Sequence, residues 1–153
     1  MKRGCNILKA LLRIYVLHFS AILAIWLAMY YPGLDILLAV IYLILLWEEG
    51  KNTWQMQPQL LRQAVVACLW QLPGFFLAGS ILLGLDRLTE FAYYFVFILE
   101  LWHTPVLPLI SLLPVWTVRG LPIYYGLLFA MVPVLTLYYC LPGIIQGRGR
   151  LSA

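Results

Sequence analysis

The sequence predicts an all-α fold, a polytopic bundle of about six transmembrane helices, and three observations lead to this prediction. The chain has 64% hydrophobic and 10% charged residues and a mean hydropathy of +0.93, whereas soluble domains have about 45–50% apolar and about 25% charged residues. The apolar residues form long runs, and the basic residues stand at their margins. A soluble globule of 153 residues needs more charged side chains to cover it. We therefore expect residues 1–153 to form a single membrane domain.

The first expected crossing covers residues 14–31, and the third covers residues 64–85. Each run is long enough to cross alone, because about 20 helical residues span a hydrocarbon core of about 30 Å. Basic residues before the first run also occur in secretory signal peptides. However, Trp26 stands where cleavage after Ala28 needs a small side chain. We expect the first run to be retained as a membrane helix.

Two shorter runs are expected to cross with their charged ends at headgroup level. One extends from Asp35 to Lys51 and the other from Asp86 to His103, which correspond to helices of about 25 and about 27 Å. A Gly-Leu-Asp turn opens both runs. Glycine suits the left-handed backbone at the end of a helix, and aspartate suits the start of the next one. We therefore expect Asp35 and Asp86 to be structural caps.

The six segments are expected to form three helical hairpins, at residues 14–51, 64–103 and 105–143. The first arm of the last hairpin, residues 105–118, contains three prolines, which disrupt a regular helix. A kinked crossing and a re-entrant stretch packed against protein are both compatible with this pattern. The alternative to six segments is therefore four or five spanning helices plus a re-entrant proline-rich segment.

The basic residues predict the orientation, because loops rich in lysine and arginine stay in the cytoplasm. With six crossings and both termini inside, eight basic residues fall in the cytoplasm and two, Arg87 and Arg119, fall outside. The eight are Lys2, Arg3, Lys9, Arg13, Lys51, Arg62, Arg148 and Arg150. We expect a cell-membrane protein with cytoplasmic N and C termini and a cytoplasmic connector at residues 48–63. The basic residues form no patch with interleaved aromatics, so nucleic acid is not an expected partner.

Pro73 lies inside the third run, where it is expected to leave the carbonyl of Leu69 without its helical donor and to kink the helix. Transporters place broken helices beside their binding sites. Membrane helices also tolerate proline for structural reasons alone, and we favour that interpretation here.

Glu100 and His103 are the best candidates for chemistry, because residues three apart share a helix face and Glu-x-x-His occurs in carboxylate-bridged metal sites. Such sites need two of these motifs and further carboxylates, and this chain has one motif. Aligning the two short runs at an offset of 51 residues places Glu49 at the depth of Glu100, with His18 in the same leaflet. We take Glu100, His103, Glu49 and His18 as the candidate binding residues, and Glu100 and His103 as the ligands of any metal.

These four residues have alternative interpretations that need no cofactor. Paired histidines on separate helices can bind haem, but polar side chains in membranes more often form hydrogen bonds between helices. The cysteines, at positions 5, 68 and 140, lack the spacing of metal ligands. The sequence therefore predicts no particular cofactor, and a hydrogen-bonded clasp between hairpins is the main alternative to a binding site.

The leading functional interpretation is a non-catalytic subunit or scaffold of a membrane complex, with the lipid bilayer and a membrane-protein partner or a second copy of the chain as partners. Its basis is short loops and few intramembrane charges. The alternative is a component for small-solute or ion transport or substrate binding, with a cavity at the kink of Pro73 or near Glu100 and His103. A metal-dependent membrane enzyme is the second alternative. The common nucleotide-binding and hydrolase motifs are missing from the sequence, which argues against an enzyme.

Overall fold

The computed structural model describes residues 2–56, 58–83, 92–113, 117–118 and 121–151, and the side chains of residues 7–56, 58–83, 94–113, 124 and 126–147. Its elements in chain order are α1 (Lys2–Ala28), α2 (Leu34–Met56), α3 (Leu60–Leu82), α4 (Ala92–His103), α5 (Leu107–Ile110), β1 (Thr117–Val118), β2 (Leu121–Pro122) and α6 (Ile123–Leu151). The two strands form one short antiparallel hairpin. The all-α fold class predicted from composition is confirmed.

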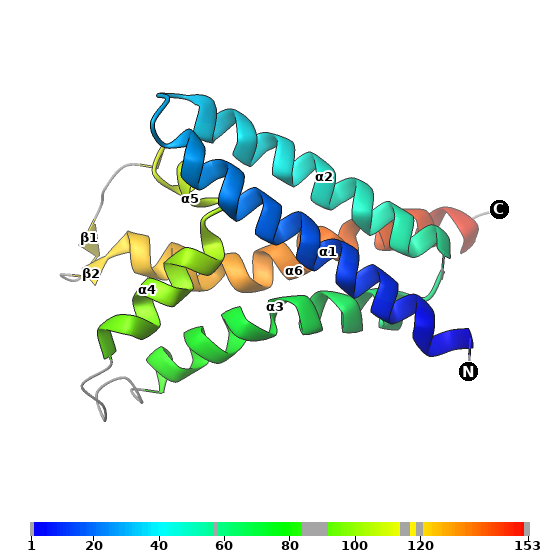
Figure 1. The fold of residues 1–153 in the computed structure, drawn as a ribbon. Helices are drawn as coiled ribbons and strands as arrows, with labels where there is room; N and C mark the ends of the chain where they lie inside the picture. Colours follow the sequence, from blue (N-terminus) through cyan, green and yellow to red (C-terminus); the bar gives the residue numbers. More distant parts are fainter. Residues whose placement is uncertain (1, 57, 84–91, 114–116, 119–120, 152–153) are drawn as a thin grey trace.

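Four long helices, α1, α2, α3 and α6, make up the body of the bundle (Figure 1). Figure 1 shows the N-terminal end of α1, the C-terminal end of α6 and the connection between α2 and α3 at one end of the bundle. The turn between α1 and α2 and the strands lie at the other end. The four long helices therefore bring the N-terminal end of α1 and the C-terminal end of α6 to the same end of the bundle.

Among the described residues, three helical stretches are long and apolar enough to cross a membrane: Ile7–Ala28, Leu60–Leu82 and Gly126–Gly147. They belong to α1, α3 and α6. α2 has 23 residues, a length of about 34 Å, but it also contains Asp35 and the charged residues near its C-terminal end. The three apolar helices are compatible with a membrane protein.

The turn between α1 and α2 has the glycine geometry that the sequence predicts. Gly33 adopts a left-handed backbone with φ of +85°, which glycine accepts without steric cost. The amide of Leu34 donates to the carbonyl of Tyr31 across this turn. Asp35 lies inside the first turn of α2, where a carboxylate favours the positive end of the helix dipole. Asp86, the second predicted cap, lies outside the described residues.

The proline-rich segment does not form the long helix that a sixth crossing requires, within its described residues. Within residues 105–113 and 117–118, the only regular helix is the four-residue α5. α4 is also short, with 12 residues or about 18 Å, and it ends two residues before Pro105 because the residue before a proline disfavours helical backbone. The six-crossing arrangement of three hairpins is therefore not confirmed.

α4 and α5 instead form an inserted segment. Figure 1 shows α4 starting at the end of the bundle that carries the strands and running obliquely inward, after which the chain returns through α5 to that same end. α4 packs against α3 and α6 through buried Leu99, which meets Leu128 and Val132 of α6. The predicted alternative, four or five spanning helices plus a re-entrant proline-rich segment, stays a prediction.

Candidate functional site

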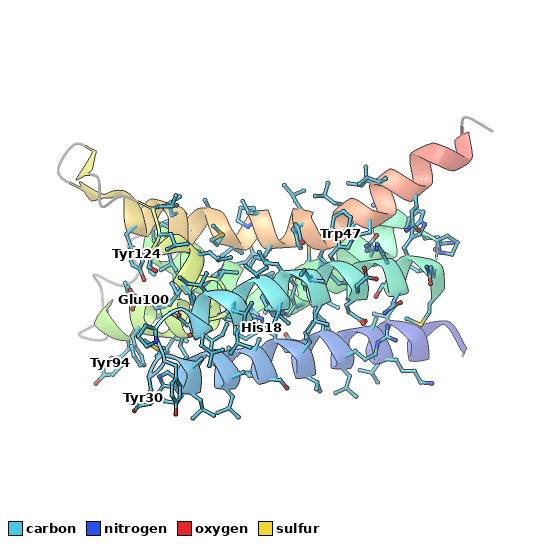
Figure 2. All side chains as sticks on the ribbon, turned by 90° about the horizontal axis from the view of Figure 1, so that it is seen from above. His18, Tyr30, Trp47, Tyr94, Glu100 and Tyr124 are labelled. Carbon is cyan, nitrogen blue, oxygen red and sulfur yellow. The ribbon has the colours of Figure 1, made fainter. Side chains whose placement is uncertain are left out.

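His18 lies in the interior of the bundle, with 1% of its surface exposed (Figure 2). Its Nδ1 is 2.8 Å from the Tyr42 hydroxyl, and its Nε2 is 3.0 Å from the carbonyl oxygen of Trp102. A carbonyl oxygen only accepts hydrogen bonds, so Nε2 donates to Trp102 and Nδ1 accepts from Tyr42. Both ring nitrogens of His18 thus form hydrogen bonds, and neither has a free lone pair to bind haem iron or another metal ion.

The hydrogen bond from His18 satisfies a helix end that lies inside the bundle. The last four carbonyls of a helix have no donor within it. In α4 each of these carbonyl oxygens accepts a hydrogen bond from outside the regular helix. Thr104 donates to two of them, from Oγ1 to Glu100 at 3.4 Å and from its amide to Leu101 at 3.3 Å. His18 Nε2 donates to Trp102 at 3.0 Å, and the amide of Val106 donates to His103 at 2.8 Å. The position is deep, because His18 precedes the end of α1 by ten residues, or about 15 Å of helix. His18 therefore allows α4 to end away from water.

Trp102 ties the same helix end to α3. Its indole Nε1 donates to Gln71 Oε1 at 3.1 Å, and Gln71 is fully buried. Its ring also lies against the imidazole of His18, with ring centroids 4.4 Å apart. The C-terminal end of α4 is thus held by polar contacts from both α1 and α3.

Three buried polar atoms in this interior have no hydrogen-bond partner among the described residues: Trp70 Nε1, Gln71 Nε2 and His103 Nε2. His103 Nδ1 lies 2.9 Å from the carbonyl oxygen of Leu99. That nitrogen must donate, so His103 Nε2 presents a lone pair. His103 is therefore bonded to its own helix, and its second nitrogen is the one polar group of the predicted site that stays unpartnered in the interior.

The surroundings of Glu100 differ from those of the two buried histidines. It lines a cavity of about 310 Å³ together with Asp35, Thr104 and Ser111 and seven apolar or sulfur-containing side chains. Asp35 and Glu49 are 14 residues apart on α2, or about 21 Å. Glu100 shares its cavity with Asp35 and therefore lies nearer that end of α2 than Glu49 does, which differs from the equal depth expected from the 51-residue offset.

Glu49 joins α2 to α1 near the other end of the bundle. Its Oε1 is 2.7 Å from Arg13 Nη2, with 12% of the Glu49 side chain and 43% of the Arg13 side chain exposed. The nearby ion pair between Lys51 and Glu48 is within one helix. Glu49 thus has a structural partner.

A second polar junction, around Gln63, ties α3 to α2 and α6 near this end. The amide nitrogen of Gln63 donates to the carbonyls of Gly50 at 3.1 Å and Tyr139 at 2.8 Å. The Tyr139 hydroxyl is 2.7 Å from Thr53 Oγ1. The sequence placed Gln63 in a polar connector. No pattern in the sequence predicted that its side chain is buried inside the bundle.

The structure places His18 and His103 near the C-terminal end of α4, whereas Glu100 lines the cavity with Asp35 and Glu49 pairs with Arg13. Within the parts of the chain that are described, no group of three or more His, Cys, Asp or Glu side chains is placed to hold a metal ion. The residues that sequence reasoning missed are Tyr42, Trp70 and Trp102, which surround His18. No family model, curated protein or solved structure matches this chain.

Proposed function

We propose that this protein is a multi-pass integral membrane protein and a non-catalytic subunit or scaffold of a complex in the cell membrane. α1, α2, α3 and α6 cross the bilayer, and α4 and α5 re-enter it from the side opposite the termini. Both termini lie at the end of the bundle that contains the connection between α2 and α3. The N-terminal half of α1 and the residues around this connection contain four basic residues, Lys9, Arg13, Lys51 and Arg62, which supports a cytoplasmic location for both termini.

The observation that carries this proposal is the use of the interior polar groups. His18 binds the end of α4, Gln71 binds the Trp102 indole, and Gln63 binds two backbone carbonyls. Each contact fixes one helix against another, as polar residues do between membrane helices. Side chains engaged in this way are suited to holding a rigid shape rather than to carrying a reaction.

The outer face of α1 is the proposed surface for a partner. We compare the share of buried residues in an apolar 18-residue stretch of each candidate span. This share is 22% for α1, 44% for α3 and 39% for α6. One stripe of α1, spaced three or four residues apart, consists of exposed Leu12, Val16, Phe19, Leu23 and Leu27. A membrane helix of another subunit, or of a second copy, would cover this stripe.

Photo-crosslinking in native membranes tests the subunit proposal. A photoreactive residue replaces Leu23 on α1 or, as a matched control, Leu137 on α6, two residues with similar exposed fractions of 58% and 61%. We expect a defined protein adduct from position 23, and co-purification of that protein in fixed stoichiometry. Lipid adducts alone from both positions, with a chain that purifies as a monomer, would reject the proposal.

A second candidate function is small-solute binding or transport. The observation that favours it is the cavity beside α4 and α5, which contains two carboxylates in a largely apolar wall. Thermal stabilisation of the purified chain by a small solute, without a protein partner, would favour this function over a scaffold.

A further inference from the structure

The cavity that contains Asp35 and Glu100 lies where four parts of the chain meet. Its walls come from the C-terminal part of α1 with the turn after it, the first turn of α2, one side of α4, and α5. Figure 2 shows Glu100 near the end of the bundle that also carries Tyr30, Tyr94 and Tyr124, whereas His18 lies nearer the middle. Tyrosines are typical of the interface between lipid and water, so the two carboxylates are close to headgroup depth.

The described lining of this cavity contains two carboxylates and no basic side chain. Arg13 pairs with Glu49 and Lys51 pairs with Glu48, and both pairs lie nearer the opposite end of α2 from Asp35. Two carboxylates near apolar walls produce a field that attracts cations, because a low-dielectric surface screens charge poorly. A positively charged group is therefore the complement of this cavity.

A second, apolar cavity adjoins the first along the contact between α1 and α4. It also has a volume of about 310 Å³. Its lining consists of apolar and aromatic side chains: Phe19, Ile22, Leu23, Trp26, Ile98, Leu101 and Trp102. Trp26 and Leu101 line both cavities. The carboxylates thus stand at one end of an apolar furrow, and we call the two cavities together the α1–α4 seam.

We propose that the α1–α4 seam binds a cationic amphiphile, with its ammonium group beside Asp35 and Glu100 and its hydrocarbon chain in the apolar furrow. An inorganic cation would leave the furrow unused, and a neutral lipid would leave both carboxylates without a counter-charge. Trp26 stands at the junction, where an indole ring can also attract an ammonium group. This site goes beyond the scaffold function, and it shares Phe19 and Leu23 with the outer stripe of α1.

Binding to the purified full-length chain in neutral detergent tests the proposal. The probes are dodecylamine, which is protonated at pH 7, dodecanol, which has the same chain without charge, and ethylamine, which has the charge without the chain. Binding is measured as the rise in Tm with probe concentration. We expect dodecylamine to bind at least about tenfold more tightly than either control probe, since a charge-assisted contact and chain burial both contribute. Equal binding of dodecanol would overturn the proposal.

Variants locate the site. The double substitution Asp35→Asn with Glu100→Gln keeps side-chain size and removes both charges, and we expect it to weaken dodecylamine binding about tenfold or more. Glu48→Gln at the other end of α2 is the matched control and should bind normally. Leu23→Trp fills the furrow, and Leu137→Trp on α6 controls for the added indole. Normal binding by a folded double variant, or by Leu23→Trp, would contradict the site.

The source of the amphiphile is identified by native mass spectrometry of the chain extracted from its own membranes. A retained lipid with a net positive amine headgroup assigns the site to the bilayer. A lipid-free chain that still binds dodecylamine assigns it to a soluble amphiphile. The scaffold function is decided by co-purification of a protein partner and this site by amphiphile binding to the purified chain, so the two can fail separately.

Discussion

The Tyr15 hydroxyl donates a 3.0 Å hydrogen bond to the carbonyl oxygen of Leu69. Pro73 is four residues beyond Leu69 and has no amide proton, so α3 cannot satisfy this carbonyl itself. A side chain of α1 supplies the donor that the helix lacks. α3 therefore continues through Pro73, from Leu60 to Leu82, without leaving that carbonyl unpaired.

We expect Tyr15→Phe to destabilise the protein by about 0.6–1.5 kcal/mol, the usual value of one hydrogen bond. The effect should be smaller in a Pro73→Ala background, where residue 73 again donates to Leu69. A double-mutant cycle on the free energy of unfolding measures this coupling. Equal losses in both backgrounds would show that the hydroxyl acts independently of the proline.

His18 should be required for the inserted position of α4. His18→Leu removes both ring nitrogens and leaves the Trp102 carbonyl and the Tyr42 hydroxyl buried without partners, so we expect a loss of about 1–3 kcal/mol. His18→Gln offers a donor and an acceptor and should recover part of that loss. The measurement is the free energy of unfolding in bicelles, and a His18→Leu protein as stable as wild type would contradict the capping role.

Gly143 is needed where α6 passes close to Gln63 and Trp54. A Cβ at position 143 would overlap Gln63 Oε1 and would lie 2.7 Å from Trp54 Cε3. We expect Gly143→Ala to cost about 1–3 kcal/mol through overpacking. Gly126→Ala in the same helix is the matched control, because a Cβ there meets nothing within 4 Å. That change should be neutral or should stabilise by up to about 1 kcal/mol. Similar Tm changes in both variants would argue against close packing.

The sequence predicted the long apolar helices because each one carries its own signal. Runs of apolar residues indicate α1, α3 and α6 by their length, and Gly33 marks the turn before α2. The helix ends were less predictable, since α1 extends to Lys2 through a basic stretch. Polar residues can continue a helix beyond the apolar run, and hydropathy does not report that continuation.

The site was harder to predict, because its contacts join residues far apart in the sequence. His18 and Trp102 are 84 residues apart, and no local pattern relates them. The motif of Glu100 and His103 was recognised by its helical spacing, but α4 directs the two side chains to different surroundings. His103 lies fully buried in the interior, whereas Glu100 lines a cavity that it shares with Asp35.

Cysteine labelling in intact cells separates four crossings from six, starting from a variant in which Cys5, Cys68 and Cys140 are replaced. In both arrangements we expect a cysteine at Gly33 to react from outside and a cysteine at Asn52 to react only from the cytoplasm. Thr104 distinguishes them, because it is 8% exposed beside the inner end of α4, whereas six crossings place it in a cytoplasmic loop. Thr104→Cys should therefore resist a membrane-impermeant maleimide from the cytoplasmic side in sealed membranes and react after denaturation. Rapid labelling of Thr104→Cys from the cytoplasmic side would restore the arrangement of three hairpins and remove the re-entrant segment from the proposed topology.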